Sequence, residues 1–155
     1  MPLSLQPLTP ESFAPFGRVL RAPKAGPRED HAATVENDRP ATARANLALI
    51  AAAAARFPLE LNMLERHSQS TQTFLPLDVR EYLVVVCLDD GHGRPDMASL
   101  IAFRVDGRTG IHYHRGTWHH AMTTIGEPGV FAMLVHEDGT PDDCQFVGIT
   151  PVNVG

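Results

Sequence analysis

Short apolar segments separated by turn residues run through most of the chain, and they limit what it can fold into. Glycine, proline and aspartate interrupt these segments roughly every eight to twelve positions, which is typical of β-sandwiches and barrels. Residues 82–88 are almost continuously apolar, as expected of a strand buried on both faces. The pattern predicts a mainly β protein with strands over residues 59–65, 71–75, 82–88, 99–105, 119–124, 130–136 and 144–149.

Finer features of these segments predict faces and turns. Alternation within residues 59–65 predicts that one face, expected to line the interior, carries Leu59, Leu61, Met63 and Glu65. Pro76 is expected to end the strand 71–75, because proline removes a backbone donor. The sequence Gly-Glu-Pro-Gly at 126–129 predicts a hairpin between residues 119–124 and 130–136.

Only one helix is predicted, and it lies near the N-terminus. Thr9 supplies a capping hydroxyl and Pro10 stands at the first helical position. Pro15 and Gly17 follow so closely that the helix is expected to be short.

Two further segments complete the organisation of the chain. Residues 21–41 mix prolines, glycines and charges and predict a loop. Residues 41–56 are rich in alanine, which favours helix by propensity. Leu47 and Leu49 lie two apart, however, and we predict a strand followed by a loop or short turn.

Composition excludes several classes of protein. The 155 residues predict a single domain over 1–155. A net charge of −5 with a single lysine, Lys24, gives no basic surface for nucleic acid or an anionic membrane. Two cysteines are too few for a disulfide framework. Because no signal peptide and no membrane-spanning stretch is found, we predict a cytoplasmic protein.

The densest polar motif is Tyr113-His114-Arg115-Gly116-Thr117-Trp118-His119-His120. With His112, four of the eight histidines fall between positions 112 and 120. Histidine titrates near neutral pH and is the commonest metal ligand, so this density indicates a metal or catalytic site. If the segment is extended, His119 and His120 point to opposite faces, and Trp118 is expected to be a packing anchor.

A second polar motif, Glu65-Arg66-His67 followed by Gln72, lies upstream. Glu65 and His67 are two apart, so in a strand they project together into the expected interior. A buried carboxylate and imidazole destabilise the fold unless they are paired or bind something. The motif therefore indicates either a buried pair that holds two strands together or part of a site.

Together the two motifs resemble the cupin layout, in which Glu65-x-His67 and Gln72 precede Gly116-x-x-His119. Glu65 stands where cupins usually carry histidine, and Gln72 stands where they carry glutamate. One carboxylate, two imidazoles and an amide oxygen suit a borderline divalent ion such as nickel, iron or zinc. The metal ligands predicted in this way are Glu65, His67, Gln72 and His119.

The complete motifs resemble the ureidoglycolate lyase family. The likeness is carried by Glu65-Arg66-His67…Gln72-x-Phe74-Leu75-Pro76 and by Tyr113 to His120, with support from Pro7-Leu8…Phe13-x-Pro15-Phe16-Gly17 and Tyr82-Leu83-Val84-Val85-Val86. Ala121 departs from the proline expected there. The resemblance implies a cupin-like β-barrel (a double-stranded β-helix or jelly roll), a homodimer and a divalent metal, with nickel the first choice. It also implies cleavage of (S)-ureidoglycolate to glyoxylate and urea in allantoin breakdown.

A mechanism can be outlined from these residues as a hypothesis. The reacting carbon of ureidoglycolate bears a hydroxyl, a carboxylate and a urea nitrogen, so cleavage needs a base and an acid. A metal would lower the hydroxyl pKa; without one, Glu65 is the predicted base and His67 its partner. The predicted catalytic residues are Glu65, His67, His119 and His120, and the predicted substrate-binding residues are Tyr113, His114 and Arg115.

Each of these residues also has a structural alternative, and so does the function. Arg115 is either a bidentate clamp for the substrate carboxylate or an ion-pair partner. His112 or His114 is a candidate for orienting a ligand from behind. The alternative functions are another cupin enzyme acting on a small oxyacid, a non-catalytic cupin that binds a carboxylate metabolite, and an amidohydrolase that releases ammonia.

Overall fold

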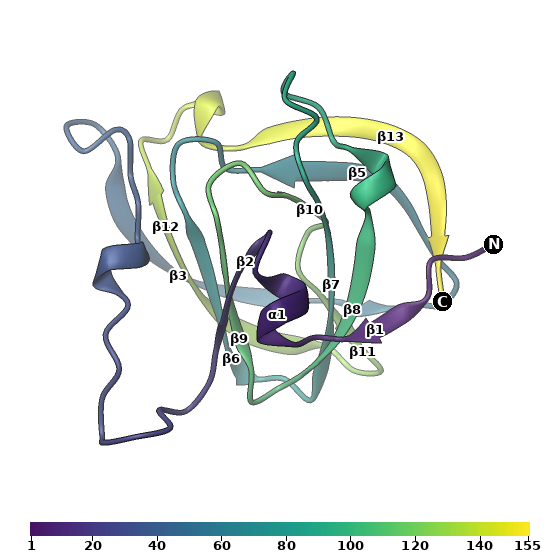
Figure 1. The fold of residues 1–155 in the computed structure, drawn as a ribbon, viewed down its shortest axis with the longest axis horizontal. Coiled ribbons are helices and arrows are strands. Elements are labelled where there is room, and N and C mark those ends of the chain that lie inside the picture. The colour runs from purple at the N-terminus through teal and green to yellow at the C-terminus, as the bar shows by residue number, and fades with distance from the viewer.

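Two β-sheets curl around a shared apolar interior (Figure 1). This computed structural model describes residues 1–155, and its elements are β1 (Leu5–Pro7), α1 (Pro10–Phe13), β2 (Gly17–Leu20), β3 (Arg44–Ala52), β4 (Ala54–Ala55), β5 (Leu59–Arg66), β6 (Gln72–Asp78), β7 (Glu81–Cys87), β8 (Ile101–Asp106), β9 (Gly110–Tyr113), β10 (Trp118–His119), β11 (Thr123–Ile125), β12 (Gly129–Glu137) and β13 (Gln145–Val154). Short 3-10 turns cover Ala32–Thr34, Met97–Ser99 and Pro141–Asp143. The eight-stranded sheet runs β1-β8-β7-β10-β5-β13, with β11 and β4 beside it, and the five-stranded sheet runs β2-β9-β6-β12-β3.

The main core fills the space between the two sheets. Thirteen buried side chains form it, and aromatic rings meet there edge to face. The Tyr82 and Phe131 rings, one from each sheet, have centroids 5.1 Å apart and planes at 77°. This is the geometry that the charge distribution of aromatic rings favours. The fold is therefore mainly β, as the sequence predicts, and its curled half-barrel is consistent with the cupin-like fold that the family resemblance implies.

Strand β7 is buried on both faces, as its apolar sequence predicts. Every residue from 82 to 87 is at most 2% exposed. Tyr82, Val84 and Val86 point into the main core. Leu83 and Val85 point the other way, into a second cluster. A strand with this environment needs apolar side chains at every position, which explains the loss of alternation.

Helix α1 is short and capped as predicted. The Thr9 hydroxyl accepts a hydrogen bond from the Ser12 amide, and the Ser12 hydroxyl accepts one from the Thr9 amide. The helix ends at Phe13, before Pro15, and the buried Phe13 ring packs against Phe103. One helical turn thus anchors the N-terminal segment on the core. No helix of the structure is long or apolar enough to span a membrane.

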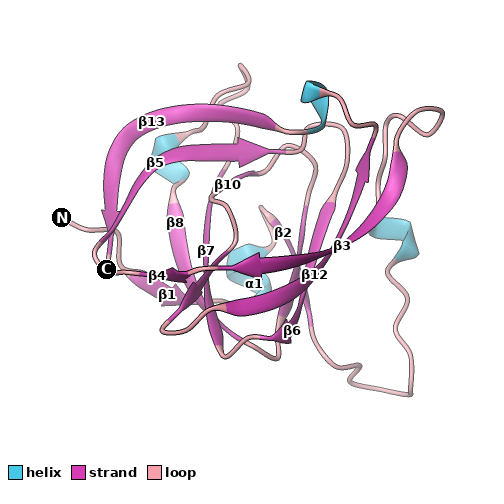
Figure 2. Cartoon of the chain, turned by 180° about the vertical axis from the view of Figure 1, so that it is seen from behind, coloured by secondary structure: helices cyan, strands magenta, loops and turns pink.

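The alanine-rich segment is a strand, as the leucine spacing predicts. β3 pairs with β12 along its whole length, from Arg44 opposite Glu137 to Ala52 opposite Gly129. Seen from behind, β3 crosses the front of the molecule beside β12 (Figure 2). Pairing with a neighbouring strand outweighs the helix propensity of alanine here.

The predicted hairpin around residues 126–129 is wrong. β11 pairs with β4 and β7 in the eight-stranded sheet, whereas β12 pairs with β3 and β6 in the five-stranded sheet. Gly126, at a φ of 84°, starts the turn that carries the chain from one sheet to the other. Glycine and proline mark a reversal of the chain but do not specify which strand each arm pairs with.

The face assignment for residues 59–65 is also wrong in part. Leu61 and Leu64, three apart, are both buried, whereas Met63 is 50% exposed. Both leucines pack beside residues of the outward face of β7, Leu61 beside Val85 and Leu64 beside Cys87. The simple alternation therefore breaks within β5, at the place where pairing with β13 shifts register. The Glu65 carboxylate lies 3.5 Å from Nε2 of the buried His119.

Pro76 does not end its strand, because β6 continues to Asp78. β9 pairs only with Gln72–Phe74, so Pro76 has a neighbouring strand on one side only. The missing N–H of a proline is tolerated at such a place.

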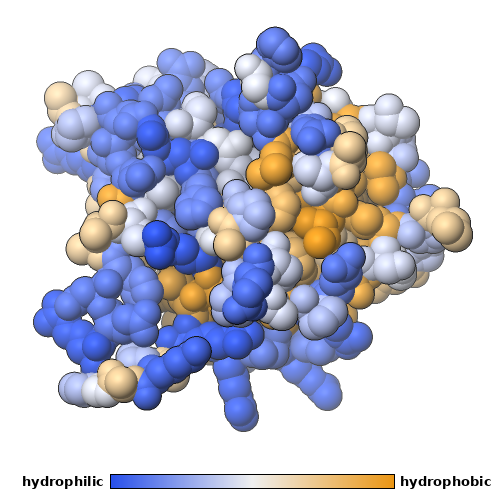
Figure 3. Space-filling model, viewed as in Figure 1, coloured by the Kyte–Doolittle hydropathy of each residue, from blue (hydrophilic) through white to orange (hydrophobic).

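The surface is uneven in polarity: apolar residues gather near β8 and β10, and polar residues cover the side that carries loop 21–43 (Figure 3).

Candidate active site

The two sequence motifs meet where β10 lies beside β5. His119 is paired with Glu65 across these strands. The backbone amide of Gly116 donates a 2.9 Å hydrogen bond to the carbonyl of His67. Gly116 has a φ of 77°, a conformation that favours glycine, so the turn between the strands needs this residue. The backbone therefore fixes the distance between the motifs before any side chain takes part.

His119 is held in one orientation inside the barrel. Its Nδ1 lies 2.9 Å from the Thr117 carbonyl, which can only accept, so Nδ1 carries a proton. The Tyr113 ring stacks on the imidazole with centroids 4.3 Å apart. Nε2 then faces the Glu65 Oε1 at 3.5 Å and is buried without a hydrogen-bond partner. His119 thus presents one free nitrogen to a carboxylate.

Glu65 is the charged group of the site. Burial would raise the pKa of Glu65, but contact with His119 and, to a lesser extent, the proximity of His67 lower it below the ordinary value. The Cys144 thiol donates to Glu65 Oε2 over 3.8 Å. The side chain remains 20% exposed. An ionised, partly accessible carboxylate beside an imidazole is suited to accept a proton from a bound ligand.

His67 and Gln72 add two more unpartnered atoms. Burial lowers the pKa of His67, and the proximity of His119 acts in the same direction, so His67 is neutral near pH 7. Its ring lies nearly parallel to that of His119, with centroids 6.0 Å apart, and its Nδ1 has no hydrogen-bond partner. The Gln72 amide donates to the Met133 sulfur at 3.2 Å, which leaves Oε1 buried and unpaired.

These atoms fit a divalent metal in chemistry but do not form a finished metal site. His67 Nδ1, Gln72 Oε1 and His119 Nε2 are buried acceptors that lack partners, and such groups are rare in native proteins. With the Glu65 carboxylate they make the donor set expected for a borderline ion. Nowhere do three histidine, cysteine or acidic side chains converge as metal ligands. A metal held here would therefore need the Gln72 amide oxygen as one of its ligands.

His120 has surroundings of its own. It lines a cavity of about 130 Å³ with Met63, Leu64, Glu65, Ala121 and Phe146. Burial lowers the pKa of His120, and a hydrogen bond to the Met63 backbone together with the charge of Glu65 opposes this effect. His120 therefore borders Glu65 without sharing the stacked contacts of His119, and it stays a candidate for proton transfer.

The predicted substrate-binding residues are differently engaged. Tyr113 forms the stacking surface of His119. Nε2 of His114 lies 3.2 Å from the Ala14 carbonyl, which holds the chain after α1. The Arg115 guanidinium forms ion pairs with Glu36, at 2.9 Å, and with Asp38. Arg115 is therefore an ion-pair partner in this structure. To bind a substrate carboxylate, it would have to release Glu36 and Asp38 first.

Trp118 is the packing anchor that the sequence predicts. It is 2% exposed and packs beside Leu64 and Cys87. Its Nε1 donates to Asp89 at 3.2 Å, and the Arg66 guanidinium lies 4.4 Å from the ring centroid. Because the indole is almost fully buried and its polar atom is bonded, it has no surface left for a ligand.

The sequence did not identify Cys144 as a site residue. The sequence predicts only that a strand starts at this residue, and β13 begins at the next one. Its contact with Glu65 arises because β13 lies against β5, with Phe146 opposite Glu65. Residues 65 and 144 are too far apart in the sequence for any motif to relate them. Only the pairing of β13 with β5 reveals this contact.

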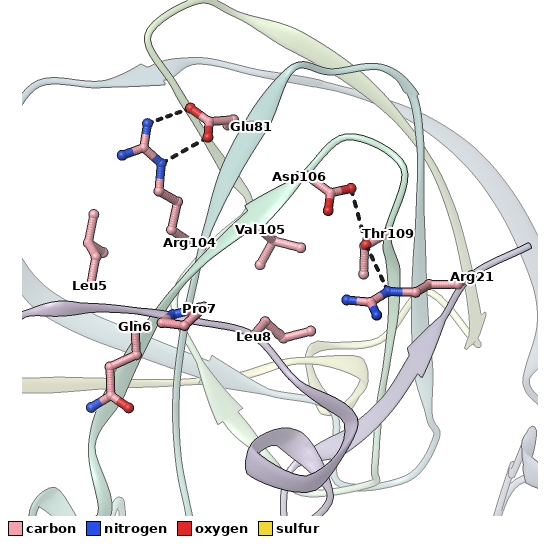
Figure 4. A pocket seen from close by; sticks show the side chains of 10 residues that line it. All are labelled: Leu5, Gln6, Pro7, Leu8, Arg21, Glu81, Arg104, Val105, Asp106 and Thr109. Atoms are coloured by element: carbon pink, nitrogen blue, oxygen red, sulfur yellow. Dashed lines mark hydrogen bonds and ion pairs between the residues drawn. The ribbon is translucent and has the colours of Figure 1, made fainter.

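A second cavity, of about 330 Å³, lies away from these residues (Figure 4). Its charged side chains are largely engaged with one another. Arg104 makes two hydrogen bonds to Glu81, and Thr109 links Arg21 to Asp106. None of the predicted site residues lines it. The candidate active site is therefore the group around Glu65 and His119.

His112 predicts how stability depends on pH. Its Nε2–H donates to the Thr34 carbonyl at 2.9 Å, so Nδ1 accepts from the Thr73 hydroxyl at 2.7 Å. Burial lowers the pKa of His112 in the folded state. The unfolded chain therefore binds a proton at this imidazole more readily than the folded chain does. As a result, the free energy of unfolding decreases as pH falls below about 6.5. Thermal unfolding of His112→Gln is expected to show a shallower loss of stability between pH 8 and pH 5 than the wild type. Equal slopes would contradict this assignment.

Comparison with known proteins finds relatives that match nearly the whole chain. The family model described as ureidoglycolate lyase matches residues 1–154. A protein named ureidoglycolate lyase from Stutzerimonas stutzeri (strain A1501) is 39% identical over 153 residues, covering 92% of this chain and 87% of its own. One of the same name from Pseudomonas fluorescens (strain SBW25) is 38% identical, covering 92% and 89%. The match extends over nearly the whole chain and includes both motifs, so the chain belongs to the ureidoglycolate lyase family.

Proposed function

We propose that this protein is a ureidoglycolate lyase that cleaves (S)-ureidoglycolate into glyoxylate and urea. The family membership supports this proposal, as do the relatives that carry that name. The observation that carries it is the contact of the ionised Glu65 carboxylate with the free nitrogen of His119. A carbon–nitrogen lyase acting on a hemiaminal needs such a pair, because one proton must leave an oxygen and another must reach a nitrogen.

In the proposed reaction the two side chains move one proton between substrate atoms. Glu65 accepts the proton of the substrate hydroxyl, and the electron pair of that O–H bond forms the carbonyl of glyoxylate. The carbon–nitrogen bond breaks, and its electron pair remains on the urea nitrogen. The proton passes from Glu65 to Nε2 of His119, 3.5 Å away, and from there to the nitrogen. His120, which also borders Glu65, is the alternative donor.

Neutral His67 and the surrounding polar groups would bind the rest of the substrate. The unpaired Nδ1 of His67 and Oε1 of Gln72 are free to accept hydrogen bonds from the urea N–H groups. Arg115 is proposed to take the substrate carboxylate by exchanging its pairs with Glu36 and Asp38. Tyr113 keeps His119 in place by stacking on it, and His114 holds the segment beside it.

We also propose that a divalent metal, with Ni²⁺ the first choice, supports the reaction. Glu65, His67, Gln72 and His119 would hold it, because three of these side chains contribute a buried atom that lacks a partner. In that case His67 and Gln72 would not be free for the urea N–H groups, and His120 in place of His119 would carry the proton to the urea nitrogen. The metal would polarise the substrate oxygens and lower the hydroxyl pKa. The protein is further proposed to act as a cytoplasmic homodimer without nucleic-acid or membrane partners.

Chelation provides the test of the metal. Dialysis against EDTA is expected to remove most urea release, and Ni²⁺ is expected to restore it. Elemental analysis of the purified protein should find about one metal ion per chain, and the Gln72→Ala/His119→Ala variant should retain less. Full activity in protein shown to be free of metal would eliminate the metal, while leaving the lyase reaction intact.

The function itself is tested by product analysis. The protein is incubated with each enantiomer of ureidoglycolate, and urea, ammonia and glyoxylate are measured separately. Equal amounts of urea and glyoxylate from the (S) enantiomer are expected. Ammonia in place of urea would identify an amidohydrolase. The absence of every product would rule out the lyase reaction and favour another cupin enzyme or a binding protein.

A further inference from the structure

Strand β3 forms an unprotected edge of the five-stranded sheet. It is nine residues long and has β12 on one side and no strand on the other (Figure 2). It contains no proline, lysine or acidic residue, and its single charge is Arg44 at its first position. Proteins normally protect such an edge with charges, prolines or bulges, because its free backbone groups readily pair with another strand.

The other edges of the two sheets show this protection. β1 and β2, at two of the edges, have only three and four residues. β13 is long, but Pro151 lies within it, its pairing shifts register between Gly148 and Val152, and Leu3 bonds to its end. Only β3 is long, regular and apolar. This contrast indicates that the β3 edge has a partner.

The outward face of the same strand is apolar as well. Leu47 and Leu49 are 73% and 71% exposed. They stand opposite Leu134 and Ala132 of β12, and Leu75 of β6, 45% exposed, continues the row. An exposed apolar row of this extent on a monomeric protein commonly marks an interface. The free edge and the apolar face adjoin, so one partner can cover both.

The sequence of β3 fits a second copy of itself. In an antiparallel pair centred on Ala48, Leu47 lies opposite Leu49 of the partner subunit, and Asn46 opposite Ile50 of the partner subunit. Arg44 meets Ala52 of the partner subunit, so no like charges face each other. One face of β3 carries an order of side chains that reads the same in both directions from Ala48. This order is Ala45, Leu47, Leu49 and Ala51. Self-complementarity of this kind is what a two-fold interface requires.

We propose that two copies of this chain join through β3, in an antiparallel pair centred on Ala48, to form one continuous sheet. The proposal rests on the proposed homodimer and names its surface.

Charge reversal across this pair tests both the surface and the register. Introducing lysine at both positions, as Leu47→Lys/Leu49→Lys, places like charges opposite each other in the proposed register. Leu47→Lys/Leu49→Glu alters the same two positions but places opposite charges there. Sedimentation equilibrium of the full chain is expected to show a wild-type dimer of twice 16.9 kDa. The two-lysine variant is expected to dissociate at least about 100-fold more readily, and the lysine–glutamate variant at least about tenfold less readily than the two-lysine variant.

The controls separate assembly from folding and from function. Both leucines are exposed, so circular dichroism and thermal unfolding should show both variants folded. Leu88→Lys, at an exposed leucine just after β7, should leave the dimer unchanged. A monomeric wild type would overturn the homodimer, and an unchanged dimer in the two-lysine variant would overturn the β3 surface. Equal dissociation of both variants would overturn the register. None of these outcomes depends on whether the protein releases urea.

Discussion

Replacing Glu65 by glutamine is expected to lower kcat for urea release by about a hundred- to ten-thousand-fold, the usual contribution of a positioned acid or base. The amide keeps the size of the side chain and a contact with His119, but it cannot accept the hydroxyl proton. Because Glu65 is ionised in the folded protein, the loss should be the same at pH 7 and pH 8. The measurement is steady-state urea release from (S)-ureidoglycolate, with kcat and KM determined separately.

Glu60→Gln provides the matched control for this substitution. Glu60 lies on the same strand, β5, but its side chain is exposed. Its activity should equal that of the wild type, and both variants should unfold at similar temperatures. A Glu65→Gln protein that is folded and keeps more than about a tenth of wild-type kcat would contradict the assignment of Glu65 as the base. The proton would then have to be taken by His67 or His120.

Replacing Phe103 by alanine is expected to remove about 3–5 kcal/mol from the free energy of unfolding, the usual cost of deleting a buried phenylalanine ring. Phe103 is fully buried, and its ring packs edge to face against Phe13, with centroids 6.0 Å apart. Domains of this kind are stable by only about 5–15 kcal/mol, so the loss would be a large fraction of the total. Equilibrium unfolding in urea measures it, through the midpoint at constant slope.

Phe146→Ala is the control, because it removes the same ring from an exposed position. Phe146 is 63% exposed on β13. Its replacement is expected to change the free energy of unfolding by about 0.5 kcal/mol or less. Similar losses in both variants would mean that the space between the sheets is not the main core.

The sequence predicted those parts of the fold that depend on local chemistry. Thr9 and Pro10 specify the start of α1, and the apolar run in β7 specifies a strand buried on both faces. It did not predict which strands pair. The hairpin expected at 126–129 crosses instead between sheets, because partner choice depends on packing of the whole barrel. The same is true of Met63, whose exposure follows from irregular pairing between β5 and β13.

The site was predictable to a similar extent. Two motifs with histidine and a carboxylate predicted that Glu65, His67 and His119 act together, and the structure brings these three into one region. The contact of Cys144 with Glu65 could not be predicted, and neither could the identity of the acidic partners of Arg115, Glu36 and Asp38. Both arise from segments that are distant in sequence and are joined only by the fold.

The hydrogen bond between the Gly116 amide and the His67 carbonyl has a consequence for redesign of this protein. It joins two main-chain segments, so it does not depend on which side chains stand at positions 67 and 119. New side chains at these two positions would inherit the same spacing. Libraries that vary positions 65, 67, 72 and 119 while keeping Gly116 should therefore yield folded proteins with altered ligand sets, and this barrel could serve as a scaffold for other small-molecule chemistry.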